Sequence, residues 1–209
     1  MPTFAVAILV AAVQAGSAAA AVQATQERVR TALNAWFKAQ GPARTKVREK
    51  ARAAVGALID FDAIAKATLA DRWDKLDPRE RARYTAALRG AMEANYLAKM
   101  RQGRTSDVDK VKVEVLGEEK MDVRTLVHTK VQSGQDSAAI DYVMEKTPKG
   151  WRAVDVITEG VSLVETYQTQ VNKIIAKKNF AAVIEALEKK RKALEAEEEK
   201  PATANAAKE

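Results

Sequence analysis

Apolar positions change their spacing twice along the chain, which divides the sequence into three zones. From about residue 22 to residue 103 they recur every three or four positions, as in Val29, Leu33 and Trp36. Between about 108 and 158 they alternate with polar positions, and beyond that the helical spacing returns. Helical spacing indicates amphipathic helices, and alternation indicates half-buried strands. The order of the zones predicts an α+β fold with helices packed on one face of a sheet.

Capping signals indicate where several helices begin. Asp60 precedes a short helix expected at about 61–69. Asp77, Pro78 and Glu80 combine a capping box with a proline in the first helical position. Ser162 directly follows a strand pattern and is expected to cap the next helix. The helix after Pro78 carries an apolar stripe at every fourth residue: Tyr84, Leu88, Met92, Tyr96 and Met100.

The middle zone predicts four strands of an antiparallel meander. Strand patterns cover about 111–115, 123–131, 138–145 and 151–157, with turn-forming residues between the later ones. One face of such a sheet is apolar and packs against the helices. Strict alternation in the fourth strand places Asp155 on the same face as Trp151 and Ala153. A carboxylate on that face needs a hydrogen-bond donor or a raised pKa.

The two ends of the chain differ in composition from the region between them. An apolar run from Phe4 to Val13 is too short to span a bilayer and is followed by small residues. This pattern is typical of a secretory signal peptide, with cleavage expected after Ala20 or Ala21. We therefore predict a signal peptide at 1–21, a single domain at 22–194 and a disordered charged tail at 195–209.

Charge and cysteine content exclude several classes of function. The 35 basic and 28 acidic residues give a net charge of +7, with the two signs interleaved. The absence of cysteine excludes thiol catalysis and thiolate metal sites. The sequence shows neither Cys/His metal spacing nor an aromatic-basic motif for RNA, and it shows no nucleotide-binding loop. We therefore expect no metal, no cofactor and no nucleic-acid partner.

Few side chains are candidates for catalysis. His128 is the only histidine and lies on the polar side of its strand pattern, where an exposed histidine without a catalytic role is the favoured interpretation. The carboxyl group of Asp155, with Glu159 nearby in sequence, is the remaining candidate for acid-base chemistry. The alternative for Asp155 is a structural anchor that binds backbone N–H groups where the strand meets the helix. We favour this anchor.

Two separated segments carry a family pattern. The segment "WRAVDVITEGVSLVETYQTQVNKII" contains a Trp, a strand ending near Asp, then Glu-Gly-Val-Ser and a helix with Tyr. The segment "LIDFDAIAKATLADRWDKLDPRERARYTAAL" supplies a second set: Phe61, Asp62, Ile64, Leu69, Trp73, Arg81 and Tyr84. Together they resemble the toluene-tolerance/MlaC family, periplasmic phospholipid carriers of the Mla pathway, which maintains outer-membrane lipid asymmetry. The resemblance covers about residues 25–192.

The sequence departs from the family pattern at a few positions. Ala70 stands where a Gly usually follows Leu69, and Glu80 stands where Gln is common. Gln168 and Val171 replace an Arg and a Phe of the helix after the Glu-Gly-Val-Ser motif. These departures concern pocket shape and partner docking more than the fold.

The resemblance implies a strongly bent, four-stranded antiparallel sheet of nuclear-transport-factor-like type, wrapped by the N- and C-terminal helices. Lipid tails are expected between sheet and helices. The pocket wall is expected to consist of residues on the apolar helix stripes and at the apolar positions of the alternating strands. These residues are Tyr96, Met100, Val127, Ile140, Tyr142, Met144, Trp151, Val164, Tyr167 and Val171. Asp155, Glu159, Gly160 and Ser162 are expected to form the seam between the last strand and the helix after it, with Gly160 allowing an unusual backbone angle.

The implied activity is shuttling of phospholipid across the periplasm, with no reaction catalysed. The expected partners are an ATP-driven inner-membrane transport complex of the ABC type and an outer-membrane lipoprotein–porin complex. Three alternatives remain open. They are a carrier of another hydrophobic lipid such as a hopanoid, an acid-base enzyme that uses Asp155, and a module that binds acidic membranes through its basic surface.

Overall fold

The computed structural model describes residues 15–102 and 111–199, and within them helices pack against one sheet. The N-terminal helices are α1 (Ala18–Lys38), α2 (Ala43–Gly56), α3 (Phe61–Leu69), the 3-10 helix η1 (Ala70–Lys75) and α4 (Pro78–Gln102). The strands are β1 (Val111–Met121), β2 (Arg124–Ser133), β3 (Asp136–Thr147), β4 (Gly150–Thr158) and β5 (Val161–Ser162). The chain continues with α5 (Leu163–Lys177) and α6 (Phe180–Glu199).

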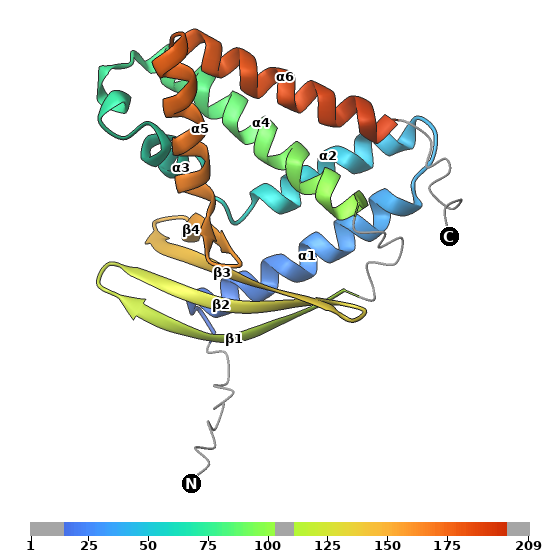
Figure 1. Ribbon diagram of the computed structural model, residues 1–209. Coiled ribbons are helices and arrows are strands. Elements are labelled where there is room, and N and C mark those ends of the chain that lie inside the picture. The colour runs from blue at the N-terminus through green and yellow to red at the C-terminus, as the bar shows by residue number, and fades with distance from the viewer. Residues whose placement is uncertain (1–14, 103–110, 200–209) are drawn as a thin grey trace, which may run out of the picture.

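The helices lie on one side of the sheet (Figure 1). Helix α1 runs along the sheet, while α2, α4 and α6 form a layer farther from it, and α5 rises from the end of β4. Neighbouring strands are all antiparallel, in the order β1-β2-β3-β4-β5, and the sheet is not closed. The α+β class, with an antiparallel sheet and flanking helices, is confirmed. Among the described helices, none combines the length and the apolar character that a membrane span requires.

The prediction of four strands is wrong, because the described sheet has five. The additional strand β5 pairs only Ile157 with Ser162 and Thr158 with Val161. The chain reverses immediately before it at Glu159 and Gly160, whose φ angles are 50° and 76°. Two residues are too few to show an alternating pattern, so the hydrophobic period contains no signal for this strand.

A β-bulge in β4 changes the face on which Asp155 lies. Val143 of β3 pairs with Asp155, and the next residue, Met144, pairs with Ala153. Val154 is therefore the extra residue of the bulge. Because paired residues share a face and neighbouring residues on a strand do not, Asp155 and Ala153 lie on opposite faces. The expectation that Asp155 shares a face with Trp151 and Ala153 is wrong, since strict alternation does not anticipate a bulge.

The predicted helix starts are confirmed where the capping chemistry is local. Asp60 accepts a hydrogen bond from the N–H of Ala63 at the start of α3. At the start of α4, Asp77 accepts from the N–H of Glu80 at 2.8 Å, and Glu80 accepts from the N–H of Asp77 at 3.0 Å. This reciprocal pair is the capping box expected from the sequence.

Ala70, at the junction of α3 and η1, has a backbone conformation that favours glycine. Its φ is 48° and its ψ is −130°. A Cβ atom is strained at positive φ, and glycine has none. The departure from the pattern noted in the sequence therefore falls on a residue whose conformation glycine adopts without strain.

The apolar core consists of three clusters. The first fills the space between α3, α4, α5 and α6 around Tyr84 and Leu88. The second lies between the start of α1 and the sheet, around Val127 and Met144. The third joins α1, α2 and α4 around Trp36.

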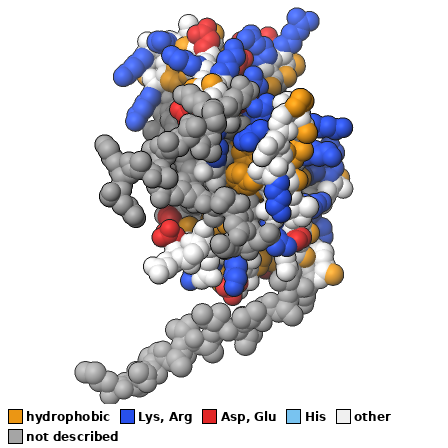
Figure 2. Space-filling model, turned by 90° about the vertical axis from the view of Figure 1, so that its right-hand side faces the viewer, with side chains coloured by type: hydrophobic (Ala, Val, Ile, Leu, Met, Phe, Trp, Pro, Cys, Tyr) orange, Lys and Arg blue, Asp and Glu red, His pale blue; other side chains and the backbone are white. Residues whose placement is uncertain are grey.

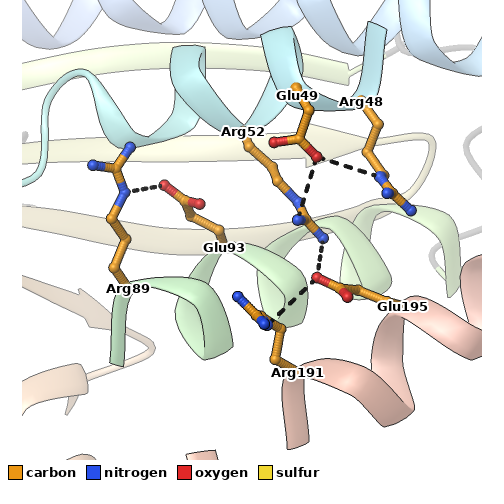
Figure 3. Close-up of polar contacts among 7 residues, drawn as sticks. All are labelled: Arg48, Glu49, Arg52, Arg89, Glu93, Arg191 and Glu195. Carbon is orange, nitrogen blue, oxygen red and sulfur yellow. Dashed lines mark hydrogen bonds and ion pairs between the residues drawn. The ribbon is translucent and has the colours of Figure 1, made fainter. Parts of the chain in front are cut away.

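Helix α6 extends beyond its predicted end. Residues 195–199, expected in the disordered tail, belong to α6, whereas 200–209 lie outside the described residues. Glu195 contributes to a charged network between α2 and α6, which Figure 3 shows beside a separate ion pair on α4. In the network, Arg52 contacts Glu195 at 2.8 Å and Glu49 at 3.5 Å, while the separate pair joins Arg89 to Glu93 at 2.8 Å. The Arg52–Glu195 pair connects the end of α6 to α2, and an argument from composition alone does not detect it.

The predicted signal peptide divides between described and undescribed residues. Residues 1–14 lie outside the described part of the chain. The expected cleavage positions, after Ala20 or Ala21, fall inside the first turn of α1. Ala18 and Ala19, which precede those positions, are buried against the sheet.

Candidate functional site

The ten residues expected in a pocket wall are distributed over the three core clusters. Tyr96 and Met100 on α4 pack beside the cluster around Trp36. Val127, Tyr142, Met144 and Trp151 belong to the cluster between α1 and the sheet. Val164, Tyr167 and Val171 on α5 belong to the cluster around Tyr84 and Leu88. Ile140 lies on β3 opposite Thr129 of β2, outside these clusters.

Solvent accessibility separates these residues into two groups. Val127, Met144, Tyr167 and Val171 are between 0% and 3% exposed, so protein atoms cover them on all sides. The remaining six keep some accessible surface: Tyr96, Met100, Ile140, Tyr142, Trp151 and Val164. Only a side chain with accessible surface borders open space. The second group therefore contains the candidates for direct contact with a ligand in this structure.

Tyr96 and Tyr142 are the centre of the candidate site. The Tyr142 hydroxyl accepts a 2.7 Å hydrogen bond from Nε2 of Gln26 on α1, 116 positions earlier in the chain. Burial raises the pKa of Tyr142 to about 12, and the Gln26 hydrogen bond offsets this in part. Burial also raises the pKa of Tyr96, and interaction with Tyr142 acts in the same direction. One residue from each of α1, α4 and β3 thus meets between the sheet and the helices.

The surroundings of the two tyrosines are those of an interior wall. Both side chains keep accessible surface, yet enough protein surrounds them that the charged phenolate is strongly disfavoured. Part of the surface of each ring is therefore left uncovered by protein atoms. Such a site offers apolar ring faces together with hydroxyl groups, and it lacks a charged side chain among the residues that meet there.

The tyrosine wall continues toward one end of the molecule. Met100 follows Tyr96 by one helical turn on α4, and Ile140 lies on the same face of β3 as Tyr142. The C-terminal end of α4 and the turn between β2 and β3 lie at this same end (Figure 1). Figure 2 faces this end of the molecule and shows hydrophobic side chains exposed among many Lys and Arg side chains.

Asp155 forms the junction between β4 and α5. One carboxylate oxygen, Oδ2, accepts a 2.5 Å hydrogen bond from the Ser162 hydroxyl. The other, Oδ1, accepts from the backbone N–H groups of Val156 at 2.8 Å and Val164 at 3.1 Å. Ser162 in turn accepts from the N–H of Glu165 and caps α5. Both carboxylate oxygens are thus occupied by donors that fix the backbone.

Glu159 and Gly160 complete this junction. The backbone N–H and one carboxylate oxygen of Glu159 bond to the carbonyl and the N–H of Ala139 on β3. Gly160 has a φ of 76°, a conformation that its missing Cβ permits. The four residues expected at the seam are therefore found together where the sheet ends and α5 begins.

His128 has carboxylate neighbours on both adjacent strands. Its Nδ1 lies 3.1 Å from Oδ1 of Asp141, and its Nε2 lies 3.9 Å from Oε2 of Glu119. Over the described residues, no group of His, Asp or Glu side chains has the arrangement of a metal site. The geometry around His128 is that of a cross-strand polar cluster.

Gln26 is a residue of the site that the sequence did not reveal. It lies on α1 and is only partly buried. Its significance depends on Tyr142, which belongs to a different zone of the chain. A single glutamine on an amphipathic helix has no local feature that distinguishes it from solvent-exposed glutamines.

The comparisons with known proteins agree with this architecture. The family model for the MlaC protein matches residues 23–189. A search of curated proteins found no match. Among solved structures, the chain is similar to a phospholipid-binding protein from Ralstonia solanacearum in complex with a phospholipid. The two share 19% sequence identity with a TM-score of 0.73, over 86% of this chain and 99% of that chain. At this identity the structural likeness establishes the fold, and the family model covers well over half of the sequence. The chain belongs to the MlaC family.

Proposed function

We propose that this protein is a periplasmic carrier that holds the acyl chains of a phospholipid between its sheet and the helices α1 and α4. The tails lie against the wall that Tyr96, Met100, Ile140 and Tyr142 form, and the headgroup stays at the end of the molecule shown in Figure 2. The observation that carries the proposal is the pair Tyr96 and Tyr142, which meet between the sheet and the helices and keep accessible surface although they are deep in the molecule.

Family membership supports the same activity. The chain is a member of the MlaC family, and the similar Ralstonia protein is described as phospholipid-binding and was determined with a phospholipid. A binding and transport protein agrees better with Asp155 than an enzyme does, because both oxygens of that carboxylate are occupied by structural hydrogen bonds. An acid-base catalyst needs a carboxylate oxygen within reach of its substrate.

The energy of lipid transfer explains why an interior site is required. Each methylene group removed from water contributes about 0.8 kcal/mol. A phospholipid with two long chains therefore faces a barrier on the order of 20 kcal/mol if its tails cross water unprotected. An exposed apolar patch shields only one side of a chain, whereas a space between sheet and helices shields all sides. The headgroup needs no such protection.

The proposal includes the finer features that the resemblance implies. The sheet is of the strongly bent, nuclear-transport-factor-like type, and bulges in β1 at Leu116 and in β4 at Val154 supply local bends. Loading and unloading take place at an ATP-driven inner-membrane complex of the ABC type and at an outer-membrane lipoprotein–porin complex. The carrier itself uses no cofactor, and phospholipid is its cargo.

The test is native mass spectrometry of protein isolated from cells, followed by extraction and analysis of the bound lipid. Near-stoichiometric phospholipid with two acyl chains is the expected result. A single lipid of another class, such as a hopanoid, would retain the interior site and replace the cargo. A folded protein that carries no lipid and takes none from phospholipid vesicles would overturn the proposal.

A further inference from the structure

The first turn of α1 is anchored by a cap, by burial and by long-range hydrogen bonds. Ser17 caps the helix, since its hydroxyl oxygen accepts a 3.1 Å hydrogen bond from the N–H of Ala20. Ala18 is 0% exposed and Ala19 is 4% exposed, and Val22, one turn later, is also fully buried. These residues contact the sheet in the cluster that contains Val127, Met144 and Ala153.

Two further hydrogen bonds tie this segment to distant strands. The indole Nε1 of Trp151 on β4 donates to the carbonyl of Gly16 at 2.9 Å, across 135 positions. The N–H of Ala19 donates to Oε2 of Glu118 on β1 at 2.8 Å, across 99 positions. Residues 16–19 thus connect β1 with β4, and Ala18 and Ala19 belong to the cluster against which Trp151 and Tyr142 pack.

This packing is inconsistent with cleavage after Ala20 or Ala21. A cut at either position removes the helix cap at Ser17 and the two buried alanines. It also leaves the Glu118 carboxylate and the Trp151 indole without the partners that they have in the structure. Buried apolar surface beside Val127 and Met144 would then be exposed to water, which is unfavourable.

We propose that a signal peptidase cleaves the chain between Ala15 and Gly16, upstream of the position that the sequence pattern alone favours. Water adds across the Ala15–Gly16 peptide bond, so that Ala15 gains a carboxylate and Gly16 gains the new α-amino group. Val13 and Ala15 supply the small aliphatic residues that such a site needs three positions and one position before the cut. The inference rests on the export that the proposed function includes, and it is independent of the cargo.

The retained segment also has a structural role in the mature protein. Residues 16–19 pack between α1 and the sheet at the end where Trp151 lies, opposite to the end shown in Figure 2. Maturation at Gly16 therefore keeps this packing in the mature protein. Cleavage after Ala21 would remove it.

The test is to produce the full chain, residues 1–209, in an exporting bacterium and to determine the intact mass and N-terminal sequence of the periplasmic protein. A first residue of Gly16 is expected. The variant Ala15→Leu is expected to accumulate uncut precursor or to be cut elsewhere, whereas the matched control Ala20→Leu still begins at Gly16. An exported wild-type protein that begins at any residue other than Gly16 would overturn the inference alone. Uncut protein that stays in the cytoplasm would overturn both the inference and the proposed export.

A second measurement tests the anchoring separately from processing. In the mature protein, Ser17→Ala removes the cap and is expected to lower the melting temperature by about 2–4 °C. The control Ser137→Ala, at an exposed position of β3, is expected to leave it unchanged. An equal melting temperature for Ser17→Ala and the wild type would contradict the structural role of the retained segment.

Discussion

Arg52 of α2 and Glu195 of α6 are 143 positions apart in the chain and are joined by a 2.8 Å hydrogen bond between guanidinium and carboxylate. The Arg52 side chain is only 12% exposed and also contacts Glu49 at 3.5 Å. The bond connects the N-terminal helical hairpin to the last helix. It also places the end of α6, which the composition alone assigns to a tail, inside the folded domain.

Loss of this carboxylate is expected to destabilise the domain. Glu195→Ala leaves a largely buried guanidinium with one weaker partner, and we expect a cost of about 1–2 kcal/mol. The matched control is Glu27→Ala, which breaks the exposed Arg30–Glu27 pair and should change stability little. Denaturant unfolding of the two variants measures the difference. Equal stability losses would show that the Arg52–Glu195 pair contributes no more than a surface pair.

Asp155 is expected to be essential for stability and dispensable for any chemistry. Asp155→Ala removes the acceptor for one hydroxyl and two backbone N–H groups at the β4–α5 junction. Leaving these donors without a partner costs about 2–3 kcal/mol. Ser162→Ala is expected to cost about 1 kcal/mol through loss of the α5 cap. Thermal unfolding checks both, with bound lipid measured per folded molecule.

The enzyme alternative predicts a different pattern for Asp155. Under that alternative, Asp155→Asn abolishes a measurable activity while the protein stays folded and retains its ligand. Under the carrier proposal, lipid bound per folded molecule is unchanged in Asp155→Asn, and only stability falls. A folded Asp155→Asn protein that no longer binds lipid would contradict the purely structural role.

A charge placed on the tyrosine wall is expected to displace the lipid. Tyr142→Glu puts a carboxylate against acyl chains, so the lipid recovered per protein should fall several-fold. Tyr142→Phe loses only the Gln26 hydrogen bond and should keep its lipid. Val123→Glu, at a position 77% exposed in the turn between β1 and β2, controls for the added charge. Full lipid occupancy in a folded Tyr142→Glu protein would exclude this wall as the binding site.

The tyrosines provide a pH-dependent signature of the folded state. Burial raises the pKa of Tyr84, Tyr142 and Tyr167 to about 12, and that of Tyr96 also lies above its ordinary value of 10. Because each phenol is harder to ionise in the folded state, these groups contribute stability below pH 10. That contribution is lost as the pH rises from 10 toward 12.

Ultraviolet absorbance during an alkaline titration tests this expectation. Phenolate should appear together with the loss of helical circular dichroism, whereas the urea-unfolded chain should titrate near its ordinary pKa of 10. Ionisation of one or more tyrosines near pH 10, in protein with intact circular dichroism, would show that those hydroxyls are accessible to water.

Ala70→Gly is expected to stabilise the protein, although glycine usually weakens helical segments. At φ 48° the Cβ of Ala70 is strained, and its removal should contribute about 1 kcal/mol. Ala67→Gly, at an exposed interior position of α3, should instead cost about 0.5–1 kcal/mol. Chemical denaturation of the two variants should therefore give shifts of opposite sign. Shifts of the same sign would mean that the backbone at residue 70 adapts without strain.

The features predicted from the sequence are those with a local cause. The caps at Asp60, Asp77 and Ser162 involve residues three positions apart, and the structure shows each of them. The fold class followed from long stretches in which the apolar positions keep one spacing, either helical or alternating. The Glu-Gly-Val-Ser motif indicated the family, because a corner residue such as Gly160 has a conformation that few residues adopt.

The features that were missed depend on partners distant in sequence. The bulge at Val154 reverses the face on which Asp155 lies. Its cause is the pairing of β4 with β3, which the alternation of apolar and polar residues along β4 does not reveal. The helical end of α6 depends on Arg52. Gln26 matters because of Tyr142. In the candidate site, the apolar stripes of the sequence identified the helices and strands that contribute to it. They did not separate fully covered residues such as Val171 from accessible ones such as Tyr96.

The asymmetry of the sheet has a consequence for self-association. One edge is occupied, since Leu58 and Asp60 form backbone hydrogen bonds with Ala153 of β4 and β5 pairs farther along the same strand. Within the described residues, β1 has a strand neighbour on one side only, and its outer backbone groups are a template for another strand. The bulge at Leu116 and the charges of Glu118, Glu119 and Lys120 interrupt that template. An edge protected in this way lets copies of the chain meet at high concentration without joining their sheets into fibrils.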